Sequence, residues 1–355
     1  MNIPPRKLAA IAFFLVAMGG IIALVRTPAE NTAVQIAQES EEASSTAQVL
    51  LAVAQPGPEL PKINAAAEPT APVQFQASGV PHILKDVGEA AFDHFGLMEK
   101  DFTMIKSAGF DAIEGNFDIC ASNEDVQYFL DSAHAVGLKV ILNAGAGEAE
   151  WGYACDGKYT AEQKPVWQKE QVRQWVEKWK DYPALYLWDT SNEDGGTMPY
   201  GTGGTMPDLN WETKFALSTE QLQQAYRDVK SFDPSHKIMI RMNGWYFYDN
   251  DSNFFRPGNA FGKDVADIVM VNAYSNVDEY FSDFVTTIML RATRSIHAID
   301  ADVQMVPALG VWREPPIWVK PTPAQLVNDF NQAVKTEDLL GIGFFKYGAA
   351  GSEWL

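Results

Sequence analysis

A candidate acid follows a short apolar segment near the middle of the chain. Residues 184–187 read Ala-Leu-Tyr-Leu, and the sequence continues Trp-Asp-Thr-Ser-Asn-Glu over residues 188–193, before a loop rich in glycine. Apolar and aromatic residues in a short run favour a β-strand, so Asn192 and Glu193 are expected at the end of a rigid element. A carboxyl group that is desolvated at such a position has a raised pKa, so it keeps its proton near neutral pH and can act as a general acid.

Acids, amides and aromatic rings also follow the other apolar segments of the chain. Those expected at strand ends are Glu114, Asp118, Trp151, Asp189, Trp245, Tyr246, Asn272, Tyr274, Trp312, Glu314 and Lys346. Flat rings can cover the CH faces of a sugar, amides and acids can bind its hydroxyl groups, and carboxylates can stabilise an oxocarbenium-like transition state. Any single ring is more simply a core residue, so the expectation of a carbohydrate site depends on their joint occurrence.

These groups need a scaffold that brings the strand ends together, and the rest of the pattern predicts one. From residue 79 onward, strand-like segments alternate with helical ones. Strands are expected at 80–84, 112–117, 139–143, 184–188, 237–242, 268–272, 303–307 and 341–346. Helices are expected at 97–108, 124–136, 164–180, 219–231, 278–298 and 323–339. Alternation implies parallel strands, and eight of them in about 275 residues match a (β/α)8 barrel.

Local signals agree with this alternation. Ser122, Ser218 and Thr322 stand where helices should begin, and Gly109 and Gly137 stand between a helix and the next strand, as C-caps do. A doubly wound open sheet is the competing fold, but no glycine-rich phosphate-binding turn follows the first strand.

The stretch 188–193 has the pattern Trp-Asp-x-x-Asn-Glu at the end of the fourth expected strand. This pattern resembles the acid/base motif of retaining (β/α)8 glycosidases, the superfamily of cellulases, mannanases and β-galactosidases. The resemblance implies that Glu193 is the general acid/base and that Asn192 binds the sugar 2-hydroxyl. That superfamily also places a tyrosine at the end of strand 6, often as His-x-Tyr, and Asn272-Ala273-Tyr274 stands at the matching place with asparagine for histidine.

The seventh strand departs from that pattern. The superfamily ends this strand in apolar-Thr-Glu-Phe-Gly, whose Glu is the nucleophile, whereas this chain reads Val-Pro-Ala-Leu-Gly over 306–310 and has Ala308 at that position. An alanine cannot attack an anomeric carbon. Glu314, on the following loop, could turn inward or simply pair with its neighbour Arg313. Another acid at a strand end could instead serve as base or nucleophile, the candidates being Glu114, Asp118 and Asp189.

We therefore expect a hydrolase-like barrel that cleaves glycosidic bonds in an oligo- or polysaccharide, with a glycan-binding barrel that has lost catalysis as the alternative. A third possibility is Schiff-base chemistry at Lys346, which follows two phenylalanines. Lys346 more simply pairs with Asp189 or Glu114. The five histidines show no metal-ligand spacing, and His82 alone is expected to face the site. Neither a metal nor a cofactor is expected.

Composition restricts the partners of the chain. A hydrophobic content of 46% supports a packed core, and a formal net charge of −19 argues against nucleic acid, whose phosphates favour basic proteins. The two cysteines, Cys120 and Cys155, lack the spacing of a zinc site. A disulfide between them is plausible outside the cytoplasm, and two unpaired thiols are the alternative.

The first 26 residues predict where the protein is located. Arg6 and Lys7 precede an apolar run over residues 8–25, whose length suits an uncleaved membrane anchor or, as the second choice, a cleaved signal peptide. Positive charge on the N-terminal side of this run places the remainder outside the cytoplasm. Residues 27–78 are rich in Ala, Pro, Glu and Ser and are expected to form a flexible linker, with the barrel over 79–355.

Overall fold

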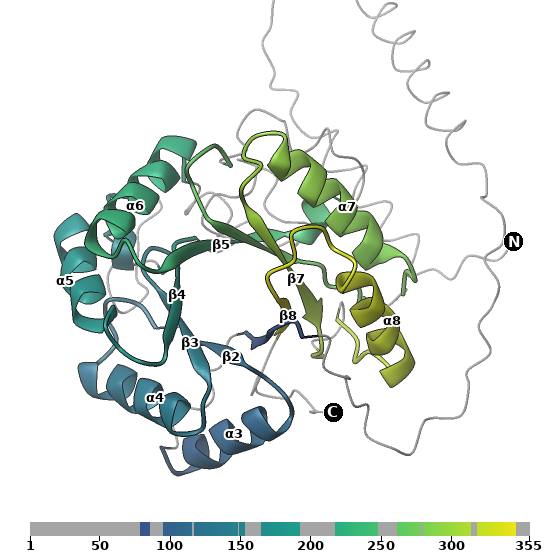
Figure 1. Cartoon of the computed structure of the whole chain (residues 1–355), viewed down its shortest axis with the longest axis horizontal. Coiled ribbons are helices and arrows are strands. Elements are labelled where there is room, and N and C mark those ends of the chain that lie inside the picture. Colours follow the sequence, from purple (N-terminus) through teal and green to yellow (C-terminus); the bar gives the residue numbers. More distant parts are fainter. Residues whose placement is uncertain are drawn as a thin grey trace, which may run out of the picture. The chain divides into compact units, whose positions relative to one another are not determined.

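Eight parallel strands close into a barrel in the chain order β1 to β8 (Figure 1). The computed structural model describes residues 79–85, 95–115, 117–147, 149–152, 165–191, 217–247, 261–277, 280–313 and 318–345, except for the side chains of 95–99, 245 and 246. The strands are β1 (His82–Leu84), β2 (Ala112–Gly115), β3 (Lys139–Asn143), β4 (Leu185–Asp189), β5 (Lys237–Asn243), β6 (Ile268–Asn272), β7 (Gln304–Gly310) and β8 (Ile342–Phe345). Because β1 pairs in parallel with both β2 and β8, the ring has no free edge. The predicted barrel is confirmed, and an open doubly wound sheet is excluded.

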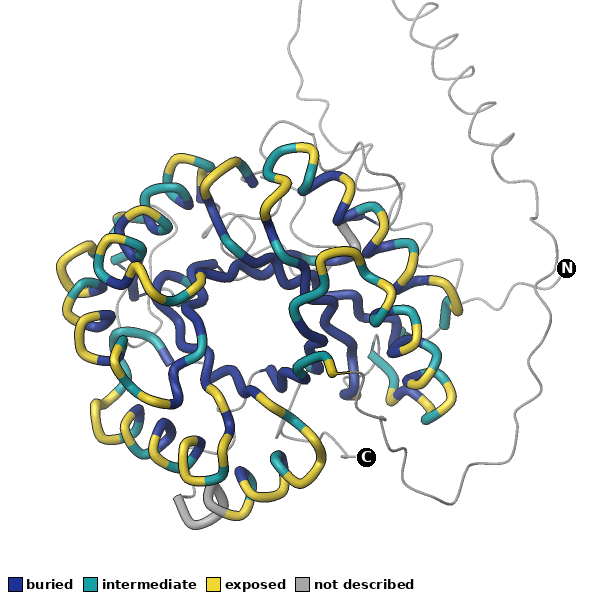
Figure 2. Tube along the Cα trace, viewed as in Figure 1, coloured by how far each residue is buried: buried dark blue, intermediate teal, exposed yellow. Residues whose placement is uncertain are grey.

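Helices surround this ring on its outside, as Figure 1 shows. Those that the structure describes are α3 (Phe95–Ser107), α4 (Asn123–Ala135), α5 (Lys169–Trp179), α6 (Thr219–Phe232), α7 (Phe284–His297) and α8 (Pro323–Ala333). Two 3-10 helices, η1 (Ala149–Trp151) and η3 (Gly244–Phe247), follow β3 and β5. Figure 2 shows the ring as almost wholly buried, while each helix is buried on one side and exposed on the other.

The predicted helix ends are present. The Ser218 and Thr322 side chains accept hydrogen bonds from the third residue of α6 and α8, and both helices have the reciprocal bond of a capping box. Ser122 caps α4 in the same way, without the reciprocal bond. Gly109 and Gly137 have φ angles of +95° and +75°, which favour glycine between a helix and a strand.

Two element bounds differ from the prediction for reasons visible in the pairing. β7 continues past the predicted end at residue 307 because Ala308, Leu309 and Gly310 pair with β8. α8 ends at Ala333 rather than at Leu339, because Leu339 forms a parallel bridge with Met305 beside β7.

The two faces of each strand have separate partners. One set of buried side chains packs against the helices, and it includes Ile113, Val140 and Trp188. The other set comes from the strands and the residues that follow them and contains no helix residue, so it fills the barrel interior: Ile83, Ala112, Ile141, Leu187, Met239, Ile268, Met270, Tyr274, Val306, Ala308 and Trp312. Because successive strand residues alternate between faces, this second set fixes which side chains enter the barrel.

The expected N-terminal anchor or signal segment (1–26) and linker (27–78) lie outside the described residues. Among the helices that the structure does describe, none is both long and apolar enough to span a bilayer.

Candidate functional site

Polar side chains replace apolar ones toward the C-terminal end of the barrel interior. On five strands a buried polar residue follows an interior apolar residue by two positions, and on β1 the polar residue comes just after the strand. These residues are Lys85, Glu114, Asn143, Asp189, Arg241 and Asn272. Active sites of (β/α)8 barrels lie at this end, so these side chains form the polar floor beneath a candidate site.

Three charges on this floor form one buried group. Arg241 Nε lies 2.6 Å from Asp189 Oδ2, and Arg241 Nη1 lies 3.0 Å from Glu114 Oε1. All three residues are at most 2% exposed. The group links β2 across the barrel interior to β4 and β5, which are neighbours of each other but not of β2.

Two carboxyl groups beside one guanidinium group carry a net negative charge unless one of them takes up a proton. Burial raises the pKa of Asp189, and nearby Glu114 raises it further, while Arg241 acts in the opposite direction. A proton on Asp189 would make this buried group neutral. Glu114 and Asp189, both predicted as possible catalytic acids, are therefore held in an ion-pair network. The predicted pairing of Lys346 with one of these acids is not tested, because Lys346 lies outside the described residues.

A second buried cation lies across the floor, and the sequence analysis missed it. Lys85 follows β1 and donates hydrogen bonds to Asn272 Oδ1 at 2.6 Å and to the Tyr274 hydroxyl at 2.9 Å. The ammonium group also lies 5.6 Å from the Tyr274 ring centre and 5.1 Å from that of Phe345. Asn272 and Tyr274, predicted to form one site, are brought together by Lys85.

Aromatic rings form a wall next to this lysine. Tyr274 stacks on Phe345, with ring centres 5.2 Å apart, and meets Trp312 edge-on at 4.9 Å. Trp318 lies 4.8 Å from Trp312. The rings hold the Tyr274 side chain in one orientation, with its hydroxyl directed at Lys85.

Ala308 is buried in the barrel interior on β7, in the same cluster as Tyr274 and Trp312. The position where the resemblance would place a nucleophile therefore faces inward but carries only a methyl group. Glu314, the nearby acid considered for that role, lies outside the described residues.

Glu150 is a further buried acid that the sequence did not single out. It lies on η1 just beyond β3, accepts a hydrogen bond from the Ile119 N–H at 3.3 Å, and its Oε2 has no hydrogen-bond partner among the described residues. Burial and the neighbouring Asp118 raise the pKa of Glu150 to about 8. Asp118, a predicted site residue, is half-buried on the loop after β2 and accepts a hydrogen bond from the Cys120 N–H at 2.8 Å.

The remaining predicted residues fall into three groups. Trp151 is in the core, where it donates to the Gly145 carbonyl at 2.8 Å and packs on Trp167, so it contributes to packing rather than to an open ring face. Trp245 and Tyr246 belong to η3, and the structure describes their backbone but not their side chains. The others that lie outside the described residues are Asn192, Glu193, Glu314 and Lys346.

The expectation for His82 is wrong. Its ring meets Phe330 of α8 and Phe344 edge-on, at 5.5 and 5.9 Å, and so faces the helices. Ile83 and Lys85 occupy the interior face of this segment instead, because side chains alternate along it.

Cys120 takes part in a disulfide bond, and Cys155, the other cysteine of the sequence, lies outside the described residues. Within the described ranges, no three His, Cys, Asp or Glu side chains gather as metal ligands would.

The fold is similar to that of known glycoside hydrolases. An endo-1,4-β-D-mannanase from Thermotoga petrophila RKU-1 matches with a TM-score of 0.51 and 12% identity, over 74% of this chain and 87% of the mannanase. A second structure of an endo-β-1,4-mannanase from Thermotoga petrophila also matches with a TM-score of 0.51 and 12% identity, over 75% of this chain and 68% of that one. No family model matches the sequence, and no match to a curated protein was found. The chain thus has the (β/α)8 fold of glycoside hydrolases.

Proposed function

We propose that this protein hydrolyses glycosidic bonds in an oligo- or polysaccharide, with Glu193 as general acid/base and Asn192 binding the sugar beside it. The observation that carries this proposal is the closed parallel barrel, in which Tyr274 follows β6 and the Asn-Glu pair continues the chain from β4. Parallel strands open onto one face of the barrel, so residues after β4 and β6 contribute to the same site. The fold shared with endo-mannanases supports the same chemistry.

The second acid of this reaction is proposed to be Asp118. A base or nucleophile must contact water or the sugar, and Glu114 and Asp189 are fully buried against Arg241. Asp118 is the one member of the three predicted acids that is partly exposed. With Asp118 as the base the reaction would be inverting, a mechanism that requires the two carboxyl groups to stand roughly 6.5–9.5 Å apart to admit a water molecule.

The test uses the full-length protein with a panel of aryl glycosides and polysaccharides that includes β-mannan, mixed-linkage β-glucan and xylan. Release of reducing ends is followed for the wild type and for Glu193→Gln, which should lose roughly 10²–10⁴-fold in kcat while retaining sugar binding. Glu177→Gln is the matched control, since Glu177 is an exposed acid of α5 paired with Arg173. Unchanged turnover in Glu193→Gln overturns the role of Glu193. Sugar binding without any turnover by the wild type indicates instead a barrel that only binds glycans.

We propose further that the protein acts outside the cytoplasm, held by or released from residues 8–25. The support is the apolar run preceded by Arg6 and Lys7. Cell fractionation and N-terminal sequencing test this: an intact N-terminus in the membrane fraction indicates an anchor, and a new N-terminus beyond residue 25 indicates cleavage. A cytoplasmic protein with an intact N-terminus overturns it.

A further inference from the structure

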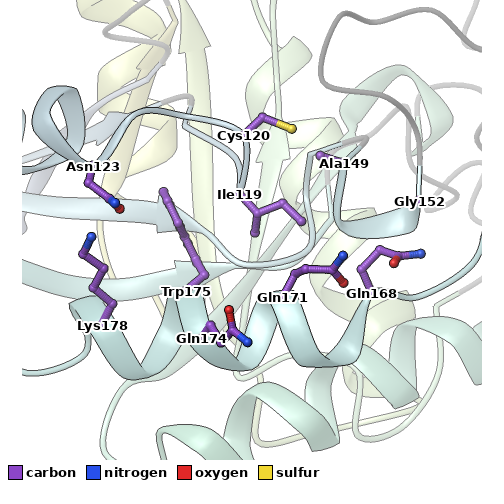
Figure 3. Close-up of a pocket in the computed structure, with 10 residues that line it drawn as sticks. All are labelled: Ile119, Cys120, Asn123, Ala149, Gly152, Gln168, Gln171, Gln174, Trp175 and Lys178. Atoms are coloured by element: carbon purple, nitrogen blue, oxygen red, sulfur yellow. The ribbon is translucent and has the colours of Figure 1, made fainter.

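A groove of about 530 Å³ lies on the flank of the barrel, between α5 and the loops that follow β2 and β3 (Figure 3). Its lining residues are Ile119, Cys120, Asn123, Ala149, Gly152, Gln168, Gln171, Gln174, Trp175 and Lys178. None of the polar residues of the barrel floor is among them. The groove is therefore distinct from the barrel floor, although it adjoins Asp118, which accepts a hydrogen bond from the Cys120 N–H. Its volume is within the ~300–1,000 Å³ range of small-molecule sites.

The α5 helix has three faces: one lines the groove with amide side chains, and the apolar face contributes Trp175 to the groove. Its apolar face packs into the protein through Val172, Trp175, Val176 and Trp179. Its charged face carries Arg173, which pairs with Glu170 and Glu177. The groove face carries Gln168, Gln171, Gln174 and Lys178, at the three- and four-residue spacing that places side chains along one side of a helix.

The chemistry of this groove face is almost neutral. Amide groups offer both hydrogen-bond donors and acceptors, and the described lining contains no carboxylate. Gln168 donates to the Val166 carbonyl at 2.7 Å and Gln174 to Glu170 at 3.0 Å, which leaves the acceptor oxygens of these two amides for a ligand. Lys178, the one cation of the described lining, lies over the Trp179 ring with 4.8 Å between Nζ and the ring centre. Phosphate or metal ligands would need arginines or clustered acids, which the described lining does not provide.

The opposite wall adds apolar surface and is held in place. The side chains of Ile119, Ala149 and Cys120 supply the apolar atoms (Figure 3), and the Cys120 sulfur belongs to a disulfide. The buried Glu150 connects the two loops behind this wall, since its carboxylate accepts from the Ile119 N–H and its carbonyl accepts from the Gln168 N–H at 2.8 Å. A groove that is already formed requires little ordering when it binds a ligand.

We propose that this groove is a second binding site, for a segment of a neutral oligosaccharide. Sugar rings combine hydroxyl groups, which amides bind in both directions, with CH faces that suit the apolar wall. The choice of sugar as ligand rests on the proposed function, but the site itself does not use the catalytic residues. Binding here would hold a remote part of a polysaccharide near the barrel mouth and so raise its effective concentration there.

The test is affinity electrophoresis of the full-length protein in gels that contain galactomannan, mixed-linkage β-glucan or, as an acidic comparison, polygalacturonate. All proteins carry Glu193→Gln, so that the polymer is not degraded. Replacing Gln171 and Gln174 by alanine should weaken binding of a neutral polymer roughly tenfold, which corresponds to the loss of about two hydrogen bonds. The matched control is Arg173→Ala with Glu177→Ala, on the charged face of the same helix, and it should bind as the parent does.

Unchanged binding by the Gln171→Ala, Gln174→Ala variant overturns the proposal, as does the absence of retardation by any neutral polymer. Retardation by polygalacturonate alone also overturns it, because that result identifies an acidic ligand held by Lys178. Hydrolysis is measured separately in proteins that retain Glu193. Turnover of a short aryl glycoside should be the same with and without the Gln171→Ala and Gln174→Ala substitutions. Groove-dependent binding by a protein that hydrolyses nothing supports the groove while refuting the proposed function.

Discussion

Lys85 donates a hydrogen bond to the Tyr274 hydroxyl over 2.9 Å, although 189 residues separate them in the sequence. The same ammonium group donates to Asn272 at 2.6 Å. The first strand thus supplies a buried cation that fixes the orientation of two side chains at the end of the sixth. In a site without an acid at Ala308, Lys85 supplies a charge that contacts the tyrosine directly.

Replacing Lys85 by methionine should therefore impair the reaction and also destabilise the fold. The change keeps the length and apolar stem of the side chain but removes two charge-assisted hydrogen bonds, each worth roughly 1.5–3 kcal/mol. We expect kcat/KM to fall at least roughly tenfold on the aryl glycoside that the wild type hydrolyses fastest. Lys139→Met is the control, because the Lys139 ammonium only donates to the Pro183 carbonyl at the surface. Equal activity in the two variants would show that Lys85 does not position Tyr274 for catalysis.

Arg241→Met should destabilise the barrel strongly. It leaves Glu114 and Asp189 buried without their cation, a change that costs about 3–5 kcal/mol. Urea unfolding measures this loss, and Arg173→Met, at an exposed ion pair of α5, should cost no more than about 1 kcal/mol. Adding Glu114→Gln to Arg241→Met should recover part of the stability, because one buried charge is then removed. Equal free energies of unfolding for Arg241→Met and Arg173→Met would show that the buried ion pairs of Arg241 with Glu114 and Asp189 do not stabilise the barrel.

The barrel could be predicted because its signals are local. Each strand is a short apolar run, and each helix start at Ser122, Ser218 and Thr322 has its own capping residue. Neither depends on distant parts of the chain. The alternation of eight such strands then permits few topologies.

The site floor could be predicted only in part, because it depends on which face each residue occupies. β1 has only three residues, too few to show a period of two, so His82 was assigned inward and Lys85 was overlooked. Knowing that Ile83 is interior corrects both assignments. The burial of Glu150 could not be predicted for a different reason: it lies on a 3-10 helix of three residues, which is too short for a repeating pattern to reveal burial.

Stability should depend on pH through Glu150. Its pKa is raised to about 8 in the folded protein, against about 4.5 for the unfolded chain, so the folded state holds more protons between these values. The contribution of Glu150 is therefore fully favourable below about pH 4.5 and is lost as the pH rises toward 8. Glu150→Gln cannot ionise, so its stability relative to the wild type should increase from pH 5 to pH 8 by a few kcal/mol, at order of magnitude.

Urea unfolding at pH 5 and pH 8 measures the Glu150 effect. Glu177→Gln is the control, since this exposed acid should give the same difference from the wild type at both values. A Glu150→Gln curve parallel to that of the wild type would show that Glu150 is already ionised in the folded protein.

The contribution of Asp233 to stability should have the opposite pH dependence to that of Glu150. Asp233 lies away from the candidate site. Burial opposes its ionisation, but hydrogen bonds from Ser235, Trp188 and His236 lower its pKa to about 2. Its contribution is thus present above about pH 3.8 and is lost as the pH falls through 2. Asp233→Asn should cost about 1–3 kcal/mol at pH 7 and progressively less as the pH falls to 2 and below, with kcat unchanged, because Trp188 faces the helices rather than the barrel interior. Thermal unfolding across this pH range, with activity at pH 7, checks both parts; a loss of kcat without a loss of stability would place Asp233 in the site after all.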